Sequence, residues 1–183
     1  MGDWVWDGGR LSIDLLNTVR DRAKAPRETL LTPSDLAAWL SEADLLAGAR
    51  VDEQALGSAR RLRAAIDTLA FPPERPEASA AEEAVTVVNA MAAQAPGGPR
   101  LARDGDRLVA VPPAPSVATA LARVALDAVD LLTGNELVRV CAAHDCGIRF
   151  ADRSPARNRQ WCSMRRCGNR TKARRHYTRS SGR

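Results

Sequence analysis

The sequence predicts a mostly helical α+β fold, in which a helical N-terminal domain with a small β-hairpin precedes a small C-terminal module. Two observations predict this organisation. Apolar residues recur at helical spacing through the first three quarters of the chain, between Pro- and Gly-rich breaks. Charge changes sign at the same boundary: residues 1–137 carry 14 basic and 20 acidic side chains, and residues 139–183 carry 13 basic and 2 acidic. We therefore predict domains over residues 1–135 and 136–183.

The overall composition is that of a chain able to fold around a core. Its 183 residues are 45% hydrophobic, which suits one domain plus a small module. No apolar run approaches the roughly 18 residues that cross a bilayer. The first ten residues lack the basic and apolar regions of a secretory signal. We therefore expect a cytoplasmic protein that is not embedded in a membrane.

Polar residues gather near the N-terminus, on an expected first helix. Asp14, Asn17 and the Arg20-Asp21-Arg22 stretch are compatible with a small polar pocket, but capping and salt-bridge roles are favoured. Trp4 and Trp6 are expected to anchor a first strand by packing, although aromatic walls also suit a ligand cleft.

Start and stop signals predict the next helices. Thr32-Pro-Ser-Asp35 is typical of a capped helix start with proline in the first turn. A second helix is expected to begin at Asp52 and to end before Pro72. Both carry apolar residues three and four apart, as one buried helix face requires.

The remaining elements of the N-terminal domain follow the same kind of signal. Ser79 and Glu82 predict a capping box that opens a third helix. Residues 101–111 predict two short strands around an Asp104-Gly105 turn. Ser116 is expected to cap a long apolar helix.

All four cysteines lie in the C-terminal module, in the order C-x4-C, fifteen residues, C-x4-C: Cys141, Cys146, Cys162 and Cys167. Each pair can deliver two thiolates to one metal from one short loop. Two disulfides or four unrelated buried thiols are the alternatives, but intracellular thiols are usually reduced. The spacing therefore favours one structural Zn²⁺.

The residues around the cysteines predict a treble-clef-like zinc finger. Ile148 and Phe150 alternate as in a short strand, and Gln160-Trp161-Cys162 is the expected returning strand. The segment after Cys167 suits a helix of about three turns, whose dipole favours the last thiolate. Gly168 is expected to let the backbone approach the sulfur closely.

Two histidines flank the predicted site. His144 lies inside the first cysteine pair, so a Cys3His site is possible, but four cysteines already satisfy zinc and a solvent-facing His144 is favoured. His176 lies nine residues beyond the last cysteine, and we expect it at the surface or near phosphate.

The C-terminal motif resembles a known family. Cys162-Ser-Met-Arg-Arg-Cys167-Gly168-Asn169-Arg170 is similar to the motif that names the CGNR zinc finger, and Arg139, Phe150-Ala-Asp152-Arg-Ser154 and Trp161 fall where that finger has them. Ala143-His144 departs from a frequent Asn-Pro. The stretch from Leu11 to Val19 resembles, more weakly, the start of the ABATE domain of bacterial stress-induced transcription regulators. The resemblance implies that the four cysteines bind zinc and that the module binds DNA.

The basic residues of the module are the candidates for nucleic-acid contact. An excess of eleven positive charges exceeds what a four-thiolate zinc site, formally −2, can offset through neighbours such as Arg149, Arg165 and Arg166. The alternative to nucleic-acid contact is a basic tail that is only solvated. The residues predicted to bind nucleic acid are Arg157, Arg159, Arg170, Lys172, Arg174, Arg175, His176 and Arg179.

No catalytic constellation is visible in the sequence. It has no Walker loop, no G-x-G-x-x-G, no H-E-x-x-H and no G-x-S-x-G, so we expect no enzyme. The short, partly apolar join from Gly134 to Arg139 predicts that finger and domain pack together. We expect a nucleoid-associated, DNA-binding transcription regulator whose N-terminal domain senses a small molecule or forms a homodimer. An RNA-binding module and a protein-interaction adaptor with a purely structural finger are the alternatives.

Overall fold

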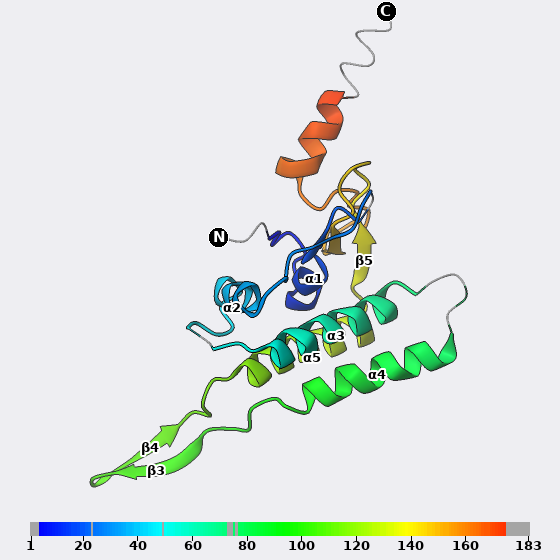
Figure 1. The fold of residues 1–183 in the computed structure, drawn as a ribbon. Coiled ribbons are helices and arrows are strands. Elements are labelled where there is room, and N and C mark those ends of the chain that lie inside the picture. The colour runs from blue at the N-terminus through cyan, green and yellow to red at the C-terminus, as the bar shows by residue number, and fades with distance from the viewer. Residues whose placement is uncertain (1–3, 23, 49, 73–74, 76, 175–183) are drawn as a thin grey trace, which may run out of the picture.

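The computed structural model describes residues 4–174, except for 23, 49, 73, 74 and 76. It is mostly helical, with three small antiparallel hairpins, which confirms the predicted α+β class (Figure 1). In chain order the elements are α1 (Leu11–Leu16), β1 (Val19–Arg20), β2 (Arg27–Glu28), α2 (Pro33–Glu42), α3 (Glu53–Ala70), α4 (Ala78–Ala92), β3 (Arg100–Asp104), β4 (Arg107–Val111), α5 (Val117–Thr133), β5 (Leu137–Val140), β6 (Arg149–Asp152) and the π-helical turn η1 (Met164–Gly168). A helix continues from η1 over residues 169–174.

The main core lies between the long helices of the N-terminal domain. Helix α3 packs against α1, α4 and α5, and α4 packs on both α3 and α5. The largest buried side chain is Trp39 of α2, on whose ring Trp6 stacks with centroids 5.7 Å apart. The segment around Trp6 forms no strand among the described residues, so the expected first strand is wrong, whereas the packing role of the tryptophans is confirmed.

Helix starts follow the sequence signals in three of four cases. Thr32, Asp52 and Ser116 each accept a hydrogen bond from a backbone N–H of the first turn. The predicted capping box at Ser79 is wrong. Helix α4 begins at Ala78 with Glu77 at the N-cap, so Ser79 already lies inside the first turn, where its hydroxyl cannot cap the helix.

The predicted β3–β4 hairpin forms, with its turn one residue later than expected. Asp104 pairs with Arg107, so Gly105 and Asp106 are the two loop residues. Gly105 has φ +60°, which matches the positive φ that tight hairpin turns require at this position. The hairpin projects beyond the ends of α4 and α5, away from the C-terminal helix (Figure 1).

The strand that pairs with β6 differs from the one predicted. Its partner is β5, with a register running from Leu137↔Asp152 to Val140↔Arg149, and not the segment Gln160–Cys162. Strand β5 thus lies in the segment expected to be a linker. Gln160 instead accepts a hydrogen bond from the N–H of Ala142, at 2.8 Å.

The outer edge of β6 is paired by the N-terminal domain. The side-chain amide of buried Asn17 donates to the carbonyl of Arg149 at 2.9 Å and accepts from its N–H at 3.0 Å. The carbonyl of Gly8 accepts from the N–H of Ala151 at 2.9 Å. An asparagine and a loop residue thus replace a third strand, and the finger shares its sheet edge with the domain.

Apolar and ionic contacts continue this junction, as the short join predicts. Val5 is buried in the same cluster as Phe150 of β6, and Ala151 packs with Ile13 and Leu131. Arg149 forms an ion pair with Asp67 of α3 at 2.7 Å. The predicted packing of finger and domain is therefore confirmed.

Helix α1 is shorter than expected, because Arg20 lies in β1 and not on the helix. Asp14 accepts a hydrogen bond from the N–H of Gly8 at 2.9 Å. Arg22 donates to the carbonyl of Leu16 at 3.0 Å and to Asp67 at 3.1 Å. Arg22 thus has the ion-pair role that the sequence favours. Asp14 holds the loop before α1 and does not cap the helix, because the N-cap, Arg10, has no side-chain capping hydrogen bond.

Asp14 is expected to make folding depend on pH. Burial raises the pKa of Asp14 to about 7, with the carboxylates of Asp127 and Asp7 adding to the rise. Between about pH 4 and 7 the folded chain retains a proton that the unfolded chain has lost, so the free energy of unfolding falls as pH rises and levels off above about 7.

An Asp14→Asn variant tests this, because its amide oxygen can still accept the Gly8 N–H. Between pH 5.5 and pH 8, the free energy of unfolding of the wild-type chain is expected to fall by about 1–2 kcal/mol relative to that of the variant. Urea unfolding of the zinc-loaded proteins measures this difference. Parallel curves of unfolding free energy against pH for the two proteins would contradict the prediction.

Within the described part of the chain, no helix combines the length and apolar character needed to span a membrane.

Candidate metal centre

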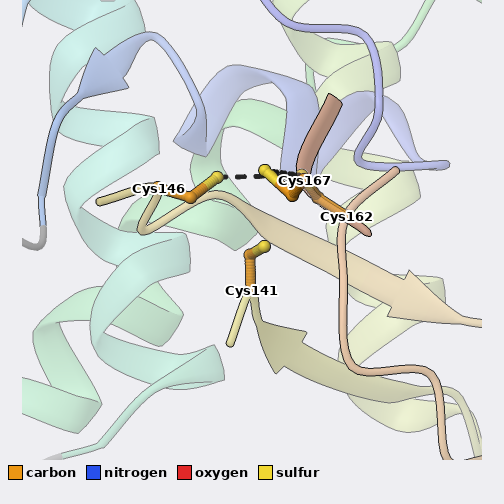
Figure 2. A group of neighbouring side chains, drawn as sticks. All are labelled: Cys141, Cys146, Cys162 and Cys167. Atoms are coloured by element: carbon orange, nitrogen blue, oxygen red, sulfur yellow. Dashed lines mark hydrogen bonds between the residues drawn. The ribbon is translucent and has the colours of Figure 1, made fainter. Parts of the chain in front are cut away.

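Four sulfur atoms converge at the end of the β5–β6 hairpin where its two strands are connected (Figure 2). Cys141 directly follows β5, Cys146 lies in the loop before β6, Cys162 precedes η1 and Cys167 lies within η1. All four Sγ atoms lie within 4.8 Å of one another. The cysteines predicted to act together are therefore brought together.

The spacing of the sulfurs fits a tetrahedral metal ion and excludes disulfides. Cys146 Sγ lies 3.7 Å from Cys162 Sγ, which lies 3.8 Å from Cys167 Sγ. Four ligands at a Zn–S distance of about 2.3 Å stand about 3.8 Å apart in a tetrahedron, whereas bonded sulfurs are about 2.05 Å apart. The site suits one structural zinc ion held by four cysteines.

The first cysteine pair is held by a tight knuckle. The N–H of Cys146 donates to the carbonyl of Ala143 at 3.1 Å, and the N–H of Cys141 donates to the carbonyl of Ile148 at 2.8 Å. Gly147 follows with φ +68°, which turns the chain back into β6. His144 is exposed at the tip of this knuckle, so the solvent-facing position is confirmed.

The second pair belongs to the start of the C-terminal helix. The Ser163 carbonyl accepts from the N–H of Cys167 at 2.9 Å and from that of Gly168 at 3.1 Å, which produces the π-helical turn. The helix thus begins at Met164, and Cys167 lies in its first turn, where the helix dipole favours a thiolate.

The role predicted for Gly168 is not the one that the structure shows, because no cysteine sulfur is among the atoms nearest to a methyl group added there. Such a methyl group would lie 2.6 Å from Met164 Sδ, near the end of a flexible, exposed side chain, and at an ordinary contact distance of 3.5 Å from the ring of Trp161. Trp161 packs against the buried cysteine cluster, as expected of a core residue of the finger.

Crowding of the sulfurs makes a central cation necessary. A hydrogen bond from Cys162 lowers the pKa of Cys146 to about 5, and the same bond raises the pKa of Cys162. Burial raises the pKa of Cys167 to about 12. Without a cation between them, thiols this close titrate as coupled groups, so that some keep their protons when others ionise. A divalent cation supplies the charge that lets all four ionise.

One arginine beside the site reaches a ligating sulfur. Arg170 Nη2 lies 3.7 Å from Cys167 Sγ and 2.7 Å from Asp145 Oδ1. Arg174 Nη2 lies 3.4 Å from the other carboxylate oxygen of Asp145. Asp145, in the first knuckle, thus ties the C-terminal helix to the finger.

The arginines expected to offset the thiolates act elsewhere. Arg149 pairs with Asp67 and covers the ring of Phe71, with its guanidinium carbon 4.3 Å from the ring centroid. Arg166 pairs with Asp7 at 3.2 Å. Arg165 is exposed. Of the candidates for offsetting the thiolate charge, Arg149 and Arg166 thus pair with acidic side chains of the N-terminal domain.

A buried carboxylate missed in the sequence organises the long loop of the finger. The side chain of Asp152 is fully buried and accepts from the N–H of Ser154 and of Arg159, and from Arg139 Nε, at 2.9–3.0 Å. Burial opposes ionisation, but these hydrogen bonds outweigh it and lower the pKa of Asp152. Its sequence signal was the Phe150-Ala-Asp152-Arg-Ser154 stretch, which falls where the CGNR finger has it but does not show what the carboxylate binds.

The residues predicted to bind nucleic acid occupy different environments. Arg159 is half-buried: it covers the ring of Phe150 at 4.7 Å and donates to the carbonyls of Trp161 and Cys162. Arg157 and Lys172 are exposed, and Arg170 and Arg174 are the arginines paired with Asp145. Arg175, His176 and Arg179 lie outside the described residues.

A helical domain joined to a four-thiolate, single-metal centre defines a zinc-finger protein. Comparison with protein families gives the same answer. The family model ABATE, described as "putative stress-induced transcription regulator", matches residues 9–135, and the model for the CGNR zinc finger matches residues 138–180. The chain belongs to the ABATE family and carries a CGNR zinc finger. No curated protein matches it.

Proposed function

We propose that this chain is a zinc-dependent, DNA-binding transcription regulator that acts through its CGNR finger. The observation that carries the proposal is an exposed basic surface built on the metal centre. Lys172 and Arg157 are exposed, and Arg170 and Arg174 keep 42% and 63% of their side chains accessible beside Asp145. Exposed cations on a small zinc module suit contact with a phosphate backbone.

The rest of the proposed role extends the description of the family as a transcription regulator. The N-terminal domain senses a small molecule or mediates dimerisation, and the protein works by binding, not by catalysis, in the cytoplasm at the nucleoid. The firm contact between domain and finger supports such a role, because a change in the domain reaches β6 through Asn17 and Arg149.

A salt series tests DNA binding by the intact, zinc-loaded chain. If about six phosphates are neutralised, the logarithm of the affinity for a duplex falls with the logarithm of salt concentration with a slope near −5. A competing RNA of the same sequence separates the two nucleic acids, since 2′-hydroxyl contacts favour RNA. Weak binding that does not respond to salt would refute the proposal, and preference for RNA would replace DNA as the target.

Arg159 and Lys172 are expected to behave differently when replaced with alanine. Lys172→Ala removes an exposed cation, so affinity falls several-fold and the salt slope flattens by about 1, with no loss of stability. Arg159→Ala uncovers Phe150 and leaves two carbonyls without their donor, so the finger loses about 1–3 kcal/mol of stability. Duplex titration and thermal unfolding measure the two effects.

Arg61→Ala, on the exposed face of α3, is the matched control for loss of one positive charge. It is expected to change neither duplex affinity nor stability by a measurable amount. A fall in affinity for Arg61→Ala equal to that for Lys172→Ala would mean that net charge, not the finger, determines binding.

A further inference from the structure

The β3–β4 hairpin is the most exposed apolar feature of the described chain. Leu101 and Leu108 are 74% and 70% exposed, more than any other large hydrophobic residue described, and Val111 is 39% exposed. The hairpin projects away from the helices (Figure 1). An isolated two-stranded hairpin is only marginally stable in water, and exposed apolar strands usually have a partner.

The outer edge of β3 is open for pairing. Within β3, no proline interrupts the edge. Its charged residues, Arg100, Arg103 and Asp104, carry both signs, so they disfavour strands that lack a complementary charge pattern. A two-residue loop closes on a hydrogen-bonded pair, here Asp104 and Arg107, so the backbone groups of Ala102 also point toward β4. By alternation, the N–H and C=O groups of Leu101 and Arg103 point outward.

The charges along β3 complement a second copy of the same strand. When two β3 strands pair antiparallel around Ala102, Leu101 meets Arg103 of the second copy, and their outward N–H and C=O groups can bond. On the opposite face, Arg100 of each copy then stands beside Asp104 of the other. Two Arg–Asp pairs form, and no like charges stand directly opposite each other. The two Arg103 side chains are diagonal neighbours, and each pairs with Asp106 of its own hairpin at 3.2 Å.

Neighbouring registers lack this complementarity. Only shifts by two residues keep outward backbone groups facing each other. One such shift places Arg103 against Arg103 of the second copy, which is repulsive. The other places Arg100 against Ala102 and loses both Arg–Asp pairs. The charge pattern therefore selects the register centred on Ala102.

The same register brings the exposed leucines together. On their face of the four-stranded sheet, Leu101 lies beside the methylene stem of Arg103 of the second copy and diagonal to its Leu101. Leu108 flanks Arg103 from the other side, since these two residues pair within the hairpin. Apolar surface that each chain exposes alone is thereby covered by the other.

We propose that the chain forms a two-fold dimer in which the β3 strands of two copies pair antiparallel around Ala102 into one four-stranded sheet. This dimer surface lies far from the zinc finger (Figure 1). Its formation does not depend on nucleic acid, so the proposal stands or falls separately from the proposed DNA binding.

Charge reversal tests the register by sedimentation of the full-length, zinc-loaded chain without nucleic acid. The wild-type chain is expected to dimerise. Arg100→Asp sets Asp against Asp104 of the second copy twice, and Asp104→Arg sets Arg against Arg100 twice. Each single variant is expected to weaken self-association about tenfold or more. An equimolar mixture restores both attractive pairs and is expected to regain a 1:1 dimer.

The mixture keeps the test independent of folding defects in either variant. Asp104→Arg faces Arg107 inside its own hairpin, but recovery with Arg100→Asp requires both hairpins to be intact. A monomeric wild-type chain, single variants that dimerise as well as the wild type, or a mixture that fails to recover would each overturn the proposal.

Cross-linking gives a second measurement. Ala102 meets Ala102 of the second copy at the centre of the interface, with Cβ atoms about 5 Å apart. Ala102→Cys is expected to yield covalent dimers with a short bismaleimide. Ala110→Cys, which lies on β4 away from the axis, and the wild-type chain, which controls for the four zinc-binding cysteines, are expected not to. Equal cross-linking of the two variants would contradict the register.

Discussion

Cys162→Ala is expected to abolish stoichiometric zinc binding and to unfold the finger. Cys162 is fully buried and lies within 3.8 Å of two other sulfurs. A structural zinc site contributes on the order of 10–16 kcal/mol of apparent binding free energy. This is as large as the whole stability of most small domains, about 5–15 kcal/mol, so three remaining thiols in a disrupted tetrahedron cannot hold the fold.

The loss is expected to spread beyond the finger. Val5 packs in the same buried cluster as Cys162, and the adjacent Trp6 stacks on Trp39 in the domain. Metal analysis of the purified protein and near-ultraviolet circular dichroism report the two effects. The matched control is His144→Ala, in the exposed tip of the first knuckle, which is expected to retain one zinc per chain. Zinc retained by Cys162→Ala and lost by His144→Ala would reverse the assignment of ligands.

Asn17→Ala is expected to destabilise the whole chain by about 2–4 kcal/mol. The substitution removes both hydrogen bonds to the backbone of Arg149 and leaves its N–H and C=O without partners in a buried junction, next to a small void. Asn17→Asp is expected to be no better, because a carboxylate cannot donate to the Arg149 carbonyl. Denaturant unfolding of zinc-loaded protein measures the loss.

The rate of zinc release distinguishes a specific role of Asn17 in positioning β6 from a general effect on stability. If Asn17 holds β6 in place, zinc transfer to a competing chelator should become faster in the Asn17→Ala variant, because the hairpin that carries Cys141 is released from the domain. Asn89→Ala, on the exposed face of α4, is the control and should change neither quantity. Wild-type stability in Asn17→Ala would show that the junction depends on apolar packing alone.

The metal centre could be predicted from the sequence because its chemistry is local. Four cysteines in two spaced pairs leave few arrangements, and the CGNR motif specifies the turn after the last one. The helix caps at Thr32, Asp52 and Ser116 are local in the same sense, since each involves a side chain and an N–H three residues away. At Ser79 the same local signal failed, because the N-cap lies two residues earlier, at Glu77.

Contacts between distant residues could not be predicted in this way. Leu137 and Val138 were interpreted as a linker because their strand partner, β6, begins more than ten residues later and offers no turn signal of its own. Arg63 is a charged residue on the apolar face of α3, where pairing with Glu28 and Thr18 permits its burial. Asp145 likewise has no distinguishing feature in the sequence, because its partners on the C-terminal helix, Arg170 and Arg174, lie 25 and 29 residues further along the chain.

The placement of Gly8 and Val5 against β6 has a consequence for the order in which the chain is made. Val5 and Gly8 leave the ribosome well before their partners, Phe150 and Ala151, which follow more than 140 residues later in the chain. Contacts of such long sequence separation form late in folding. We therefore expect the segment around Val5 and Gly8 to remain accessible to proteases in each new chain until the finger has been synthesised and has captured zinc, so that metal supply determines how many chains survive.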